Sequence, residues 1–229
     1  MRKFIFYLIF LLIPLVNDAR VVGLNTINSA GVINLELYKA VNLSELGLDK
    51  TIFELAIKGL NKLVSSGKLL NSTIVTIVDF SQSCNKKRLY VIDLKNKRML
   101  FNTYVAHGRN TGTEFAKSFS NEEGSLKSSL GFYITAHPIT GSHTGFSLMI
   151  DGVEKGINDH ACKRAIIIHG ADYVTENFIR KNGRLGRSLG CPALPPDLNK
   201  PIIETIKDGT CLFIYNPDNH YLGNSSLLN

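Results

Sequence analysis

The feature that most restricts the fold of this chain is a change in residue pattern near Asn71. From there to the C-terminus, short apolar runs rich in β-branched and aromatic residues alternate with turns rich in Gly, Asn and Ser. Such runs, bounded by turn residues, are typical of β-strands. The runs expected to form strands are 73–80, 88–94, 99–106, 131–136, 146–150, 165–168 and 210–215. Since the first three follow one another closely, they predict a three-stranded meander.

Helices are expected in three stretches. Apolar residues between Ser44 and Val64 recur at steps of three and four, and Gly67 follows as a stop. The residues on this face are Phe53, Ala56, Ile57, Leu60, Leu63 and Val64. A short helix is expected over 173–182, with Asp172 as its N-cap and Gly183 at its end, and another over 197–207. The sequence therefore predicts a mostly β (α+β) domain with short helices over residues 71–229, preceded by an N-terminal helical segment over 20–70.

The N-terminus has the features of a bacterial secretory signal peptide. Arg2 and Lys3 precede a 13-residue apolar run over 4–16, and a short polar stretch ends at Ala19. The run is shorter than the roughly 20 residues that a transmembrane helix needs. We therefore expect residues 1–19 to be a signal peptide, either cleaved after Ala19 or retained as the only membrane contact. The protein is expected to be exported, to the periplasm or cell envelope.

Charge and cysteine content say less about function. The net charge is +7, and it would be +6 without residues 1–19, which hold two basic residues and one acidic residue. This moderate basicity suits an anionic cell wall or membrane surface, and the scattered basic residues do not indicate a nucleic-acid partner. Of the four cysteines, Cys211 lies in an apolar run and is expected to be buried. The sequence leaves open whether Cys84 and Cys162, which lie in polar surroundings, are exposed or paired with each other.

The candidate catalytic residues lie between residues 165 and 195. An apolar run leads into His169 and Gly170, and Cys191 follows 22 residues after the histidine, at the end of the sequence Ser-Leu-Gly-Cys. The end of a strand can hold a histidine rigidly, and a Gly-Cys turn can present a thiol among free backbone N–H groups. These are the base, nucleophile and oxyanion hole of a cysteine acyl-transfer site. The competing interpretation is an inert buried cysteine beside a core histidine.

Three further residues flank the thiol. Arg184 and Arg187 are expected to bind a substrate carboxylate, unless they belong to a solvated basic loop. Ser188 is expected to hydrogen-bond to the substrate or within its own turn. The sequence contains no CxxC, HxxxH or HExxH pair, P-loop or Rossmann fingerprint, so neither a metal nor a cofactor is expected. Residues 108–131 are rich in Gly, Ser, Thr and Asn and predict a long loop.

At these residues the chain resembles the YkuD-like L,D-transpeptidases of bacterial cell-wall synthesis, especially the branch described as murein L,D-transpeptidase catalytic-domain proteins. The similarity covers roughly residues 45–225. The resembling segments are TIVDF (76–80), RLYVIDL (88–94), VAHG (105–108), FSN (119–121), SSLGFY (128–133), GVEKGIN (152–158), IHGADYV (168–174) and GRLGRSLGCPAL (183–194). The resemblance implies that Cys191 is the nucleophile and His169 its base, with the Gly170 carbonyl orienting the imidazole. The N–H groups of Gly190 and Cys191 would form the oxyanion hole.

The resemblance also implies an activity. Cys191 would attack a peptidoglycan stem peptide, release its terminal D-alanine and form a thioester, which an amine of a neighbouring stem resolves. Carbapenems, which inhibit the family, would be inhibitors. Leu189 stands where the wider family usually has histidine, and Ala193 where a polar or basic residue is common, so substrate and acceptor choice stay open.

Four other functions also fit these residues. With water as acceptor the protein would be an L,D-carboxypeptidase, and with a protein amine as acceptor it would be an anchoring enzyme. A non-catalytic peptidoglycan-binding protein would keep the fold with Cys191 as a bystander. An exported cysteine endopeptidase would use the same thiol to cut ordinary peptides.

Overall fold

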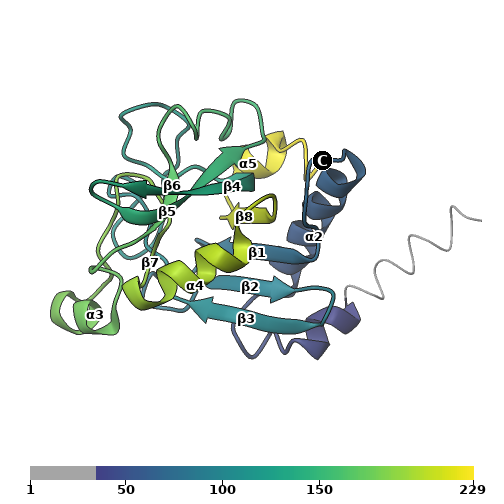
Figure 1. Ribbon diagram of the computed structural model, residues 1–229, viewed down its shortest axis with the longest axis horizontal. Helices are drawn as coiled ribbons and strands as arrows, with labels where there is room; N and C mark the ends of the chain where they lie inside the picture. Colours follow the sequence, from purple (N-terminus) through teal and green to yellow (C-terminus); the bar gives the residue numbers. More distant parts are fainter. Residues whose placement is uncertain (1–34) are drawn as a thin grey trace, which may run out of the picture. The chain divides into compact units, whose positions relative to one another are not determined.

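The computed structural model describes residues 35–229, which belong to one compact unit. The expected signal peptide over 1–19 lies outside the described residues, as does the beginning of the expected helical segment. An eight-stranded sheet runs through the unit in the order β3-β2-β1-β8-β4-β5-β6-β7 (Figure 1). The fold is mostly β with short helices, as predicted. Among the described residues, no helix is both long and apolar enough to cross a membrane.

All seven expected strands are present, together with one that the sequence pattern did not reveal. They are β1 (Ile74–Asp79), β2 (Leu89–Asp93), β3 (Arg98–Thr103), β4 (Gly131–Gly141), β5 (Gly145–Gly152), β6 (Ile167–Gly170), β7 (Ala193–Leu194) and β8 (Cys211–Tyr215). The meander of β1, β2 and β3 is antiparallel, as expected. β8 inserts between β1 and β4, parallel to the first and antiparallel to the second. The unforeseen β7 has only two residues, too few to show a strand pattern, and pairs in parallel with β6.

Besides a helical stretch over 35–40, the helices are α2 (Lys50–Ser65), α3 (Glu176–Asn182), α4 (Pro196–Ile206) and α5 (Asn219–Asn224). α3 ends at Gly183 in the left-handed conformation, as predicted. Its predicted N-cap was wrong, because the side chain of Thr175, not Asp172, accepts the hydrogen bond from the Phe178 N–H at 3.1 Å. Thr175 has the extended backbone of an N-cap and stands directly before the first helical residue, whereas Asp172 is too far upstream.

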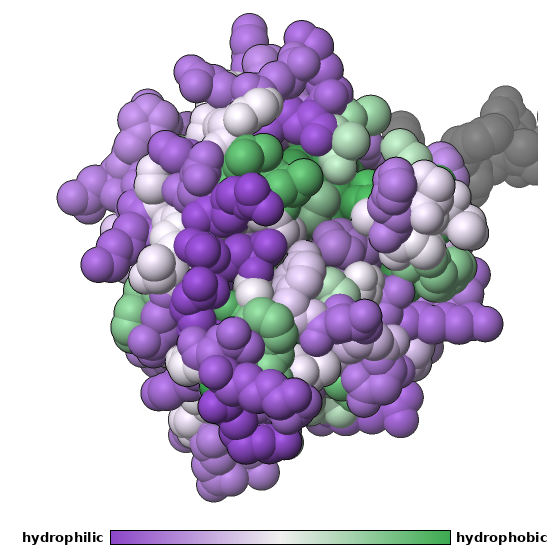
Figure 2. Space-filling view, turned by 90° about the vertical axis from the view of Figure 1, so that its left-hand side faces the viewer, coloured by the Kyte–Doolittle hydropathy of each residue, from purple (hydrophilic) through white to green (hydrophobic). Residues whose placement is uncertain are grey.

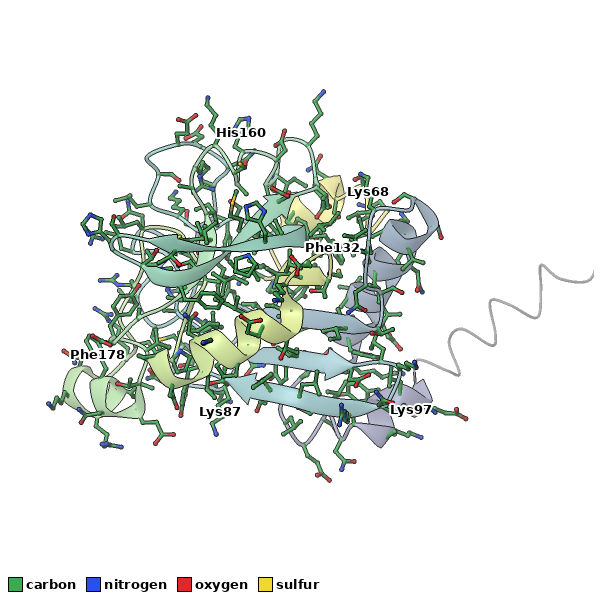
Figure 3. The ribbon with its side chains drawn as sticks, viewed as in Figure 1. Lys68, Lys87, Lys97, Phe132, His160 and Phe178 are labelled. Atoms are coloured by element: carbon green, nitrogen blue, oxygen red, sulfur yellow. The ribbon has the colours of Figure 1, made fainter. Side chains whose placement is uncertain are left out.

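Helix α2 packs against β1 and β8 through its apolar face. Gly59 on this face allows the close approach, since a Cβ there would lie 2.0 Å from the Phe132 ring. Phe132, labelled in Figure 3, in turn stacks on Phe213 of β8 with ring centroids 4.2 Å apart. Val64 was predicted on the buried face but is 45% exposed, because the apolar pattern does not reveal how far the partner surface extends along the helix.

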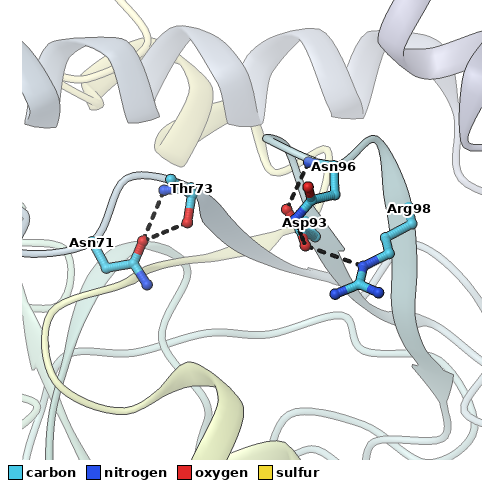
Figure 4. Close-up of polar contacts among 5 residues, drawn as sticks. All are labelled: Asn71, Thr73, Asp93, Asn96 and Arg98. Carbon is cyan, nitrogen blue, oxygen red and sulfur yellow. Dashed lines mark hydrogen bonds and ion pairs between the residues drawn. The ribbon is translucent and has the colours of Figure 1, made fainter.

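Polar side chains shape the two turns that begin and end the β1–β2 region (Figure 4). Asn71 Oδ1 accepts hydrogen bonds from the Thr73 N–H at 2.9 Å and the Thr73 hydroxyl at 2.7 Å, just before β1. Between β2 and β3, the Asp93 carboxylate accepts from the Asn96 N–H at 2.9 Å and from Arg98 Nε at 3.2 Å. Hydrogen bonds from Asn96 are the main cause of the lowered pKa of Asp93. These side chains replace backbone partners where the chain reverses.

Candidate active site

The strands β6 and β7 bring His169 and Cys191 together. His169 is paired with Ala193 in the parallel β6–β7 ladder, and Cys191 lies two residues before Ala193. On its other side His169 pairs with Ser147 of β5. β6 is next to the edge strand β7, and the neighbouring strands on both sides hold it in place.

The turn that carries the thiol is closed by Ser188. Its hydroxyl donates to the Cys191 carbonyl at 2.6 Å and accepts from the Gly190 N–H at 3.1 Å. Of its two predicted roles, Ser188 therefore performs the one within the turn. This geometry differs from the expected oxyanion hole, because the Gly190 N–H is already engaged by the hydroxyl. Within residues 35–229, no such bond to another residue is found for the Cys191 N–H, which remains available to a ligand.

Close backbone approaches explain the glycines of this turn. Gly190 has φ +132°, and a Cβ there would lie 2.9 Å from the Lys127 carbonyl oxygen and 3.0 Å from Ile166 Cδ1. A Cβ on Gly108 would lie 2.9 Å from Gly190 Cα. Only glycine combines this conformation with these contacts at low cost. The turn is thus enclosed by the segment 105–108 on one side and by the loop over 120–129 on another.

The loop over 108–131 was predicted from composition, and the structure shows that its end contacts the thiol turn. Ser128 Oγ donates to the Gly190 carbonyl at 2.9 Å and accepts from the Gly108 N–H at 3.1 Å. The Ser128 N–H donates to Thr111 Oγ1 at 2.7 Å. One buried serine therefore ties both ends of this loop to the turn before Cys191.

The thiol and the imidazole line the same hollow, which we call the thiol pocket. Its volume is roughly 570 Å³. The lining residues are Arg109, Thr144, Arg164, Ala165, Ile166, Ile167, His169, Tyr173, Arg187, Ser188, Leu189 and Cys191. On the face of the molecule that carries β7 and α3, apolar surface is gathered within a hydrophilic border (Figure 2). The lining contains three arginines and no carboxylate, so the pocket favours an anionic ligand.

The His169 imidazole is oriented by its own strand end. Nδ1 lies 2.9 Å from the carbonyl oxygen of Gly170, in agreement with the orienting role expected for that carbonyl. When Nδ1 carries the proton and donates to this oxygen, Nε2 is left as the free proton acceptor. The side chain is 9% exposed, so its rotamer is restricted while one edge reaches the pocket.

The surroundings of the Cys191 thiol affect its pKa in opposite directions. Burial raises its pKa, which disfavours the thiolate. The Ile167 N–H and the Arg164 guanidinium act in the other direction and lower the pKa. Sγ also lies 3.8 Å from the Ala165 carbonyl oxygen. A base is therefore needed for the thiol to ionise readily at neutral pH, and His169 is the imidazole in the same pocket.

Of the two arginines expected to bind a substrate carboxylate, Arg187 lies at the thiol pocket and Arg184 does not. Arg187 lines the thiol pocket, and its Nη1 donates to the carbonyls of Gly112 at 3.1 Å and Arg109 at 3.3 Å. Burial and the nearby guanidinium groups of Arg184 and Arg109 lower the pKa of Arg187. Arg184 does not line the pocket, and its Nη1 donates to the Leu185 carbonyl at 2.8 Å.

Sequence reasoning missed Arg109, Arg164 and Tyr173 as lining residues. Arg109 follows the VAHG segment directly, and Arg164 precedes the strand that carries His169, so both adjoin segments already singled out. Their basic character gave no distinct signal because basic residues are scattered along the chain. Burial, together with the nearby Cys191 thiolate charge, raises the pKa of Tyr173 to about 12, so this phenol is neutral at physiological pH.

A buried polar cluster supports the segment 105–108 beneath the turn. Arg88 is fully buried under the Phe80 ring, and its Nη2 lies 2.8 Å from His107 Nδ1. Burial and the Arg88 charge lower the pKa of His107 to about 3, so this imidazole is neutral and accepts the hydrogen bond at Nδ1. The His107 carbonyl accepts from the Ser188 N–H at 3.0 Å. The cluster thus connects the core to the thiol turn.

The remaining cysteines are free thiols in the structure, which answers the question of whether Cys84 and Cys162 pair. Cys84 is buried and Cys162 is exposed, so the two do not form a disulfide. Cys211 is buried, as predicted, and burial raises its pKa to about 12. In the part of the chain that the structure describes, His, Cys, Asp and Glu do not gather in a group that could hold a metal ion.

A protein-family model matches most of this chain. A model of the family described as L,D-transpeptidase catalytic domain matches residues 44–215. No curated protein is similar enough to count as a relative.

Similar solved structures include three proteins. An L,D-transpeptidase from Mycobacterium smegmatis is 10% identical (TM-score 0.39), with 63% of this chain and 59% of that chain covered. The helical cell shape determining protein Pgp2 from Campylobacter jejuni is 16% identical (TM-score 0.44; 70% and 54% covered). An L,D-transpeptidase from Xylanimonas cellulosilytica is 11% identical (TM-score 0.37; 68% of both chains covered). The matched region thus spans little more than half the length of the first two.

The family match includes more than half of the chain and contains the whole thiol pocket. The resemblance seen in the sequence is therefore confirmed. This chain belongs to the L,D-transpeptidase catalytic domain family.

Proposed function

We propose that the protein is a cysteine-dependent L,D-transpeptidase that acts on peptidoglycan stem peptides. The observation that carries this proposal is that His169, on β6, and Cys191, in the turn just before the neighbouring parallel strand β7, line one pocket. The thiol has an imidazole within the same hollow, and that imidazole is oriented by a backbone carbonyl. This is the combination of nucleophile, base and orienting group that acyl transfer needs.

In the proposed reaction, His169 takes the proton from Cys191, and the thiolate attacks the carbonyl of the diamino-acid residue before a terminal D-alanine. A C–S bond forms, and the C–N bond to D-alanine breaks as His169 returns the proton to the leaving amine. The thioester is then attacked by an amine of a neighbouring stem, which forms the cross-link and releases the thiol. The Cys191 N–H is the donor that we assign to the developing oxyanion, since the Gly190 N–H is engaged by Ser188.

Recognition of the donor stem is assigned to the basic lining of the pocket. Stem peptides carry free carboxylates, and guanidinium groups bind carboxylates in paired hydrogen bonds. Arg187 is held at the pocket by the carbonyls of Gly112 and Arg109. Leu189 is 58% exposed at the same pocket and offers an apolar contact where the wider family usually has histidine.

The deciding experiment incubates the purified protein with defined muropeptides and reads the products by mass. A cross-linked dimer with loss of D-alanine supports transpeptidation, whereas loss of D-alanine alone indicates an L,D-carboxypeptidase. Binding without turnover indicates a peptidoglycan-binding protein, and cleavage of ordinary peptides an endopeptidase. Cys191→Ala is expected to abolish turnover while keeping the fold, and Cys162→Ala, at an exposed thiol, is the matched control.

The proposed substrate requires export. We assign residues 1–19 to a signal peptide and the protein to the periplasm or cell envelope. Cell fractionation and N-terminal sequencing of the mature chain test this assignment. A mature protein recovered in the cytosol with Met1 at its N-terminus would contradict it.

A further inference from the structure

The side chain of Arg164 makes an unusual set of contacts beside the thiol. Its guanidinium donates to four acceptors, all of them in the loop over 120–129. Nη1 donates to the Ser120 carbonyl at 2.7 Å and to Ser129 Oγ, and Nη2 donates to Ser125 Oγ at 3.2 Å and to the Lys127 carbonyl. The flexible arginine side chain is therefore held in one position.

That position borders the thiol turn. Arg164 Nη2 would lie 3.5 Å from a Cβ built on Gly190, and Arg164 lines the thiol pocket with Cys191. The same Lys127 carbonyl that accepts from Arg164 would lie 2.9 Å from that Cβ. The guanidinium is thus bonded to the loop and lies beside Gly190, the residue before the proposed nucleophile.

The charge of Arg164 is not neutralised by a carboxylate. Its four acceptors are carbonyl and hydroxyl oxygens, and the ion pairs found within residues 35–229 do not include it. The side chain of neighbouring Lys163, by contrast, pairs with Glu123 and is 70% exposed. A partly buried cation without a counter-ion stabilises negative charge that develops close to it.

We propose that Arg164 is a positioning residue that supplies positive charge to the Cys191 thiolate and fixes the loop over 120–129 against the thiol turn. The inference rests on the proposed function of Cys191 as nucleophile. The other groups that face the thiol are His169 from β6, Tyr173 after β6, and Arg109 and Arg187 at the rim of the pocket. Arg164 differs from them in being held by four hydrogen bonds to the loop that lies against the turn.

The test follows the pH dependence of Cys191 alkylation by iodoacetamide, which needs no substrate. A Cys162→Ser background removes the exposed thiol, and Cys84 and Cys211 are buried. Arg164→Gln is expected to raise the midpoint of the alkylation profile by about one pH unit, the usual size of the effect of a nearby opposite charge. Arg164→Lys keeps a charge but not the planar fork, so its midpoint is expected between those of the parent and the glutamine variant.

Lys163→Gln is the matched control, because it removes a cation from the adjacent position and one contact to the same loop. Its profile is expected to equal that of the parent. An unchanged midpoint in Arg164→Gln, or an equal shift in Lys163→Gln, would overturn the proposal. If Arg164→Gln does not fold, Arg164→Lys decides, and a midpoint identical to that of the parent counts against the role of Arg164.

Activity provides a second readout. If the parent processes muropeptides, Arg164→Gln is expected to lower kcat about tenfold at neutral pH with little change in KM, because a one-unit rise in pKa reduces the thiolate fraction tenfold. Absence of muropeptide turnover in the parent would reject the proposed function. The alkylation series would still report on Arg164, so the two failures are distinguishable.

Discussion

The Ser188 hydroxyl donates a 2.6 Å hydrogen bond to the carbonyl oxygen of Cys191 and closes the turn that presents the thiol. The oxygen of this hydroxyl also accepts from the Gly190 N–H. Ser188, expected from the sequence either to contact the substrate or to bond within its own turn, therefore shapes the backbone around Cys191. The side chain is 4% exposed, so the hydrogen bonds are protected from water.

Removal of this hydroxyl is expected to lower both the stability of the fold and the rate of turnover. Ser188→Ala leaves the Gly190 N–H and the Cys191 carbonyl without their partner, which costs about 1–3 kcal/mol of unfolding free energy. Because the turn relaxes, kcat is expected to fall about tenfold, with a smaller change in KM. Urea unfolding and muropeptide kinetics measure the two effects. Ser226→Ala, at an exposed serine, is the control, and full activity in Ser188→Ala would show that the turn holds without it.

His169→Ala tests the base. If the imidazole both accepts the thiol proton and protonates the leaving amine, the variant loses at least ~10²-fold in rate. Burial raises the pKa of Cys191, so without the imidazole the alkylation of this thiol is expected to shift to higher pH. His137→Ala, at an exposed histidine of β4, should behave as wild type. Identical alkylation profiles in wild type and His169→Ala would make His169 a structural residue.

A carbapenem is expected to acylate Cys191 and no other cysteine. The strained β-lactam carbonyl reacts with a thiolate, and ring opening keeps the leaving amine tethered, which slows release. Burial raises the pKa of Cys211 to about 12 and also raises that of Cys84, so neither is a competing nucleophile. Cys162 is exposed and serves as an internal control for non-specific reaction.

Peptide mapping by mass spectrometry shows which cysteine carries the carbapenem. One added carbapenem on Cys191 is the expected result. Adducts shared with Cys162 would show that Cys191 has no special reactivity, and an active enzyme without any adduct would show that the pocket excludes the bicyclic ring.

The buried carboxyl of Glu154 gives a pH-dependent stability. Glu154 is 1% exposed, accepts from the Phe132 N–H at 2.8 Å and contacts the hydroxyls of Tyr221 and Ser225, which joins β4 to the C-terminal segment. Burial raises its pKa above the ordinary glutamate value. The stability that depends on this group is fully present below the unfolded-state pKa and is lost as pH rises through the higher folded-state pKa.

Glu154→Gln removes this titration. The unfolding free energy of the wild type, measured relative to Glu154→Gln, is therefore expected to fall between acidic and neutral pH. Urea unfolding of both proteins across a pH series measures the difference, and Glu122→Gln, at an exposed glutamate, is the control. A difference that is constant with pH would mean that the carboxyl titrates alike in the folded and unfolded chains.

Local patterns were sufficient for much of the fold and for singling out the two side chains that we propose to react. Runs of β-branched residues predicted seven strands because a strand needs only a few consecutive residues that suit an extended, buried backbone. Helical spacing predicted α2 and α4, and flanking cap residues predicted α3, whose left-handed end followed from Gly183. The Gly-Cys turn and the histidine at a strand end indicated Cys191 and His169 without any knowledge of their distance.

Tertiary structure alone decided how these parts meet. β1 pairs with β8, although Val75 and its partner Cys211 are far apart in the sequence, and β7 exists only because it pairs with β6. Likewise, Arg164 and Ser128 reach Gly190 from distant segments, whereas Arg184 beside the turn does not line the pocket. Residue type and spacing report interactions over a few neighbouring positions. The partner of a strand depends on segments that only the packed core brings together. The same holds for the hydrogen-bond partner of an N–H group and for the burial that changes a pKa.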